Sequence, residues 1–147
     1  MLNIKSGNTV NKYLLVGAAL SALAGLLHIG IIIKGETWYR FFGAGEELAT
    51  LATQGSLIPT LITGGIALVL FIWALYALAA ARGDYLPLMK PALITISGVY
   101  LLRGLAVIPV LIFSPTMADA FLLISSVICT FYGAIHTLGT IQYWKSI

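Results

Sequence analysis

Four long runs of apolar residues, separated by short polar gaps, dominate the chain. A helix needs about 20 apolar residues to cross the hydrocarbon core of a bilayer. The runs therefore predict membrane-spanning helices at about residues 13–34, 56–81, 91–113 and 117–144. Pro109 lacks an amide donor and should kink the third helix. We expect an all-α integral membrane protein, with residues 1–147 forming one antiparallel bundle of four transmembrane helices.

Residues 36–55, between the first two runs, mix aromatic, small and charged side chains. Read as a helix, the segment places its aromatic residues on one face and Glu36 and Arg40 on the other. These two residues have the i,i+4 spacing of a helical ion pair. The pattern is typical of a short amphipathic segment lying in the membrane interface, interrupted at Gly43 or Gly45. A re-entrant segment covered by protein is the alternative.

Composition supports membrane insertion. Of the 147 residues, 60% are hydrophobic and 9% are charged, and the mean hydropathy is +1.01. Soluble domains are about 25% charged, and a chain this small has too much surface to hide so much apolar material. The net charge of +3 comes without a basic run, so nucleic acid is not an expected partner. The first run is too long for a signal-peptide core, and we expect a retained helix.

The basic residues predict the topology, because cytoplasmic loops carry an excess of Lys and Arg. With the N-terminus inside, five basic residues lie on the cytoplasmic side and two on the other: Lys5, Lys12, Arg82, Lys90 and Lys145 against Lys34 and Arg40. We therefore expect both termini in the cytoplasm, and the amphipathic segment on the outer side.

Arg103 is the one charged residue within the third apolar run. A cation in the middle of a membrane span is costly unless it is paired, hydrated or able to snorkel to water. Tyr100, one turn earlier, and His28 in the first run are candidate neighbours, and the outer segment could bring Glu46 or Glu47 to the guanidinium. Three interpretations stay open: a structural ion pair, a snorkelling side chain, or a site for an anion or polar head group.

Two stripes of small or polar residues follow helical spacing. Close packing within the chain, or a homo-oligomer, explains the small residues of the first helix; its stripe is Gly17, Ser21, Gly25 and His28. The stripe of the fourth helix is either a set of hydroxyl-to-backbone bonds or one wall of a polar cavity; it includes Ser125, Cys129, Tyr132 and His136.

The two histidines do not suit a shared haem or metal. At about 1.5 Å per residue, His28 and His136 should differ by about 10 Å in depth. The chain also has neither a Cys-x-x-Cys-His motif nor a dense His/Cys cluster. We expect no metal and no cofactor.

Three stretches resemble a group of small uncharacterised four-helix bacterial inner-membrane proteins. They are the aromatic segment Trp38–Glu46, the Trp73-Ala-Leu-Tyr76 motif, and the stretch Val99-Tyr-Leu-Leu-Arg103. The resemblance implies a bacterial inner-membrane location, and that the aromatic segment and Arg103 belong to one shared feature. It implies no activity.

The function that the residues favour is binding or transport of a small amphipathic, lipid-like or anionic molecule within the bundle. The candidate ligand-binding residues are Arg103, His28, Tyr100, Glu46, Glu47, His136 and Tyr132. An accessory subunit of a larger membrane complex is the alternative. An intramembrane enzyme ranks third, because no nucleophile motif such as Gly-x-Ser-x-Gly is present.

Overall fold

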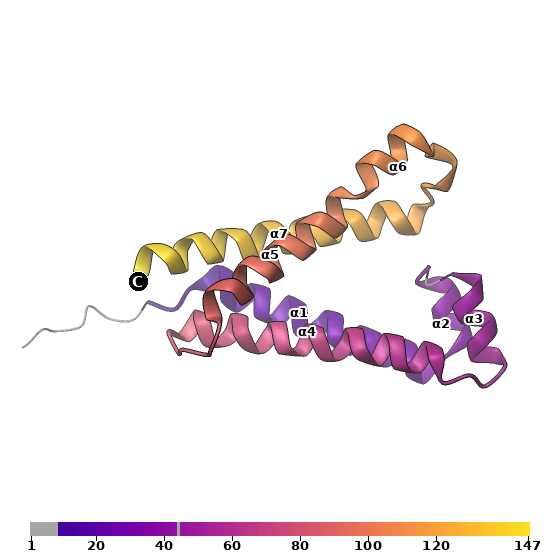
Figure 1. Ribbon diagram of the computed structural model, residues 1–147, viewed down its shortest axis with the longest axis horizontal. Coiled ribbons are helices and arrows are strands. Elements are labelled where there is room, and N and C mark those ends of the chain that lie inside the picture. The colour runs from indigo at the N-terminus through magenta and orange to yellow at the C-terminus, as the bar shows by residue number, and fades with distance from the viewer. Residues whose placement is uncertain (1–8, 44) are drawn as a thin grey trace, which may run out of the picture.

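The computed structural model describes residues 9–43 and 45–147, and its regular structure there is entirely helical (Figure 1). Four stretches are long and apolar enough to cross a membrane, which confirms the predicted four helices. Lys5, which entered the charge count, lies outside the described residues. The elements are α1 (Lys12–Lys34), α2 (Glu36–Phe41), α3 (Glu46–Thr53), α4 (Ile58–Arg82), α5 (Met89–Leu105), α6 (Val107–Phe113), a short 3-10 turn η1 (Pro115–Met117) and α7 (Ala120–Ser146).

The long helices form two pairs, α1 with α4 and α5 with α7. In Figure 1 the pairs meet near the C-terminus and diverge toward the end that carries α2, α3 and α6. Glycines allow the helices of the second pair to touch closely. A Cβ atom on Gly133 would lie 2.8 Å from the backbone nitrogen of Leu101. A Cβ atom on Gly104 would lie 2.5 Å from the backbone nitrogen of Thr130.

Asn11 joins the two pairs at the end where they meet. Its side-chain oxygen caps α1 by accepting a hydrogen bond from the backbone of Leu14, which satisfies an otherwise free amide. Its side-chain amide donates to the carbonyl of Gly139 on α7, at 2.8 Å. Its backbone N–H donates to the carbonyl of Ala81 near the end of α4, at 3.0 Å. One buried residue therefore connects three helices.

The third apolar run is broken. Helix α5 ends at Leu105, Ala106 interrupts it, and α6 continues to Phe113. Pro109 explains the break, since it cannot donate to the carbonyl of Leu105 four residues earlier. Figure 1 shows that α6 then turns away from α7. The sequence predicts a kink here, and the structure places the interruption one turn before the proline.

Helices α2 and α3 pack across the end of the α1–α4 pair. Gly43 and Gly45, with φ of 65° and 93°, lie where the chain leaves α2 and enters α3. Only glycine adopts such angles freely. The ring of Phe42 packs edge-on against Phe121 at the start of α7, with 6.5 Å between centroids. This aromatic contact links the α2–α3 segment to the second helix pair.

Candidate functional site

A buried polar cluster joins the two helix pairs near the middle of the long helices. The Ser21 hydroxyl of α1 lies 2.9 Å from the Tyr100 hydroxyl of α5. It also lies 3.1 Å from Nε2 of His136 on α7. A serine hydroxyl can donate one hydrogen bond and accept two, so it can serve both partners. Ser21 and His136 are each 0% exposed, and the cluster therefore belongs to the interior of the chain.

Aromatic packing holds this cluster in place. Tyr100 stacks on the His136 ring with centroids 5.3 Å apart and planes 19° apart. Trp73 from α4 and Tyr132 from α7 contact Tyr100 edge-on, with centroids at 5.3 Å and 5.4 Å. The absent side chain of Gly17 provides the space for the imidazole, since a Cβ there would lie 2.9 Å from Cε1 of His136. All four long helices thus contribute to one core.

The Ser21–His136 contact has the distance of a nucleophile and its base, but other side chains enclose it. Both side chains are fully covered, and their neighbours are aromatic rings rather than a carboxylate that would orient the histidine. Nδ1 of His136 has no hydrogen-bond partner within the described chain. The cluster therefore has the geometry of a structural junction.

Arg103 lies on α5 one turn beyond Tyr100, on the same face of the helix. Its Nη2 donates to the Ser125 hydroxyl at 3.1 Å, and its Nη1 donates to the Ser126 hydroxyl at 3.3 Å. Neither ion pair found in residues 9–43 and 45–147 involves Arg103. Its partners are neutral hydroxyls, which satisfy donors but do not balance the charge.

The structure does not bring the acidic residues of the outer segment to Arg103. Glu46 pairs with Arg40 at 2.7 Å, and Glu36 pairs with the same guanidinium, as its i,i+4 spacing predicts. Hydrogen bonding from Arg40 lowers the pKa of Glu46 below its ordinary value. Glu47 is exposed. Glu36 and Glu46 therefore connect α2 with the start of α3 through Arg40.

Other candidate residues have different partners from those expected. The Tyr100 hydroxyl bonds to Ser21 and not to the guanidinium. Nδ1 of His28 donates to the carbonyl of Ala24 in its own helix, at 2.7 Å. Because His28 follows Ser21 by seven residues, or about two turns, it lies on the helix face directed toward the second pair.

The small-residue stripe of the first helix packs inside the chain. Gly17 faces His136, Ser21 bonds to Tyr100, and a Cβ on Gly25 would lie 2.9 Å from the Phe71 ring. The stripe is therefore used to bring α1 against the other helices of the same chain.

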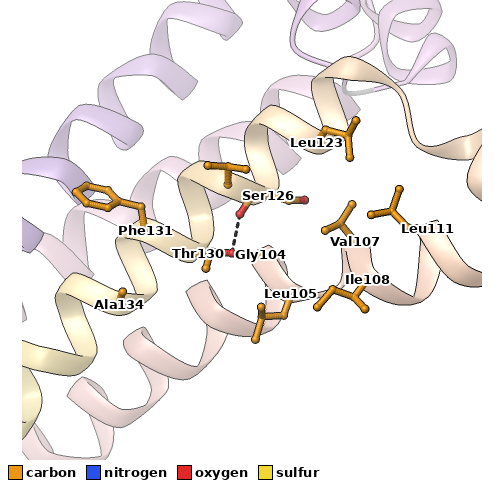
Figure 2. A pocket seen from close by; sticks show the side chains of 11 residues that line it. Gly104, Leu105, Val107, Ile108, Leu111, Leu123, Ser126, Thr130, Phe131 and Ala134 are labelled. Carbon is orange, nitrogen blue, oxygen red and sulfur yellow. Dashed lines mark hydrogen bonds between the residues drawn. The ribbon is translucent and has the colours of Figure 1, made fainter.

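An apolar groove lies between the α5–α6 segment and α7, and sequence reasoning missed it. Figure 2 shows Val107 and Leu111 on one side and Leu123 on the other, with Gly104 and Thr130 at the narrow end. Its volume is about 510 Å³; the lining residues are Gly104, Leu105, Val107, Ile108, Leu111, Leu123, Ser126, Val127, Thr130, Phe131 and Ala134. The break before Pro109 was the only signal for it.

Within the described residues, no group of three His, Cys, Asp or Glu side chains is placed to hold a metal ion. A comparison of the chain with protein-family models, with curated proteins and with solved structures finds no match. The function must therefore be inferred from the residues of the chain itself.

Proposed function

We propose that this chain is an integral membrane protein of the bacterial inner membrane that binds a small anionic, amphipathic molecule. In this proposal α1, α4, α5–α6 and α7 cross the bilayer as an antiparallel bundle, with both termini in the cytoplasm. The ligand binds at Arg103, in the half of the bundle where the helix pairs diverge. The length and apolar character of the four helices support the membrane placement.

The observation that carries the proposal is the set of partners around Arg103. A lone arginine at the centre of a membrane helix costs about 2.5–3.5 kcal/mol on insertion scales. The two serine hydroxyls supply acceptors but no opposite charge. Arginine presents a planar fork of donors that suits a carboxylate or a phosphate. An anionic head group would balance the charge that the described residues leave uncompensated.

Two competing interpretations, the structural ion pair and the docking subunit, account for less, whereas snorkelling of Arg103, which is exposed, is separated from binding by the test below. A structural ion pair needs a carboxylate, and neither ion pair of the described residues includes Arg103; Glu46, expected as its partner, is bound to Arg40. A docking subunit would use an exposed stripe of small residues, and the stripe around Ser21 is buried. Binding is therefore the function that the contacts support best.

Thermal unfolding of the purified protein tests the proposal, with decanoate as the probe and decanol as its uncharged match. A ligand that binds only the folded state stabilises it by about 2.7 kcal/mol at a concentration of 100 times Kd. We expect decanoate to raise the unfolding midpoint of the wild type and decanol to leave it nearly unchanged. Monitoring tryptophan fluorescence is suitable because Trp73 contacts Tyr100, one turn from Arg103.

Two variants of the same residue provide the controls. Arg103→Gln keeps hydrogen-bond donors without the charge, and we expect the response to decanoate to disappear. Arg103→Lys keeps the charge, and we expect a weaker response to remain. Equal stabilisation by decanoate and decanol, or an unchanged response of Arg103→Gln, would contradict the proposal.

A further inference from the structure

The apolar groove of Figure 2 and the Arg103 site share one residue. Ser126 lines the groove, and its hydroxyl accepts a hydrogen bond from Nη1 of Arg103 at 3.3 Å. Arg103 is not itself part of the groove wall, but it immediately precedes Gly104, which is. A cation is therefore hydrogen-bonded to one of the two hydroxyl residues, Ser126 and Thr130, that line an otherwise apolar surface.

The shape of the groove follows from the broken helix. Helices α5 and α7 touch at Gly104, where no side chain separates the two backbones. Two residues later Ala106 interrupts the run, and α6 leaves α7 at an angle (Figure 1). The apolar side chains of Val107 and Leu111 then face Leu123 across the gap (Figure 2). The groove is consequently narrow at Ser126 and wider toward η1.

We infer that this groove holds the hydrocarbon chain of a single-chain anionic amphipath, a fatty-acid-like carboxylate whose head group binds at Arg103 beside Ser126. The inference rests on the function proposed above and specifies the class of ligand. An anion that replaces the Ser126 hydroxyl as the acceptor of Nη1 would lie at the narrow end of the groove. Its chain would then continue along α6 and α7.

Three properties of the groove favour this occupant. Its volume of about 510 Å³ falls in the lower half of the range of about 300–1,000 Å³ for small-molecule sites, which suits one chain better than two. Its walls are apolar apart from the hydroxyls of Ser126 and Thr130. It is also open to the outside, since Val127 on its wall is 70% exposed, so a chain could enter from surrounding lipid.

Photo-crosslinking in phosphatidylcholine nanodiscs tests the inference. The probe is a palmitate analogue that carries a diazirine midway along its chain, and the crosslinked peptides are identified by mass spectrometry. We expect the label on residues 104–111 and 123–134, and we expect palmitate to compete for it while hexadecanol does not. A label on the exposed face of α4 instead would overturn the inference.

Two neighbouring residues of α7 provide a matched pair of variants. Val127 lines the groove and Ile128 does not, although both are well exposed at 70% and 48%. Neither replacement by tryptophan disturbs a buried residue. Because an indole in the groove would overpack it, we expect Val127→Trp to lower the labelling about tenfold. Ile128→Trp should label like the wild type.

The outcomes separate this inference from the function on which it rests. If decanoate stabilises the protein through Arg103 but Val127→Trp labels as strongly as Ile128→Trp, the groove is not the chain site and the proposed function stands. Equal competition by hexadecanol and palmitate would show that the site does not require an anionic head group, which would contradict this inference. If neither decanoate nor the palmitate probe binds, both proposals are wrong.

Discussion

The contact between α5 and α7 at Gly104 can be tested with a single methyl group. In Gly104→Ala the new Cβ would clash with Oγ1 of Thr130, and it would lie 2.5 Å from the Thr130 backbone nitrogen and 2.9 Å from the Ser126 carbonyl oxygen. Rotating the Thr130 side chain can relieve the first contact only. The other two involve backbone atoms, so the two helices must move apart.

Gly98, on the same helix, provides the matched control. A Cβ there would meet nothing within 4 Å, so Gly98→Ala should gain only helix propensity, about 0.8–1 kcal/mol. Gly104→Ala has the same gain but overpacks a helix contact, which typically costs about 1–3 kcal/mol. The propensity gain cancels between the two variants. Because backbone atoms are involved, we expect a difference near the upper end, about 3 kcal/mol.

Reversible unfolding in mixed micelles, followed by circular dichroism as the fraction of denaturing detergent rises, measures this difference. Gly98→Ala should be at least as stable as the wild type, and Gly104→Ala should unfold at a clearly lower detergent fraction. Equal stability of the two variants would mean that α5 and α7 do not cross at Gly104. That result would also remove the narrow end of the groove.

Two further predictions concern the junction and the outer turn. Ser21→Ala leaves the hydroxyl of Tyr100 and Nε2 of His136 without their common partner, and we expect a loss of about 1–3 kcal/mol in the same unfolding assay; an unchanged midpoint would refute the buried cluster. The pKa of Glu46 is lower in the folded protein than its ordinary 4.5. Its ionised carboxylate therefore contributes to folding stability above pH 4.5, and this contribution is lost as the pH falls through the lowered pKa. Hydrogen exchange of residues 36–53 should therefore become faster in the wild type as the pH falls below about 4.5. The change should be smaller in Glu46→Gln. If Glu46→Gln and the control Glu47→Gln respond to pH in the same way, Glu46 is not the source of the response.

The positions of the helices could be read from the sequence because helix length and apolar content are local properties. Four long apolar runs predict four helices that are long and apolar enough to cross a membrane, and the structure has all four. Gly43 and Gly45 interrupt the outer segment for an equally local reason, their positive φ. Pro109 likewise predicts a break in the third run, although the residue at which α5 ends depends on how that helix packs against α7.

The partners of Arg103 could not be read from the sequence. A lone arginine in an apolar run predicts that hydrogen-bond acceptors lie nearby. These acceptors are on α7, 22 and 23 residues later in the chain. Their position depends on where α5 crosses α7, and both Gly104 and Gly133 lie at that crossing. The stripe around Ser21 shows the same limit. Its spacing predicts close helix packing, but it cannot distinguish another part of the chain from a second copy.

The helix pairs meet at the end that contains Asn11 and diverge at the end that carries α2, α3 and α6. This arrangement favours binding over transport by a single copy. Alternating access would require the helix pairs to separate where they now meet, breaking the bonds of Asn11 and of Ser21. These groups are buried, so each bond broken without a new partner costs about 1–3 kcal/mol. At the other end the pairs touch through the apolar contact of Phe42 with Phe121, and an anion at Arg103 would itself replace the hydroxyl acceptors, so that no donor is left unpaired. A ligand at Arg103 should therefore change the angle between the pairs while the junction stays closed.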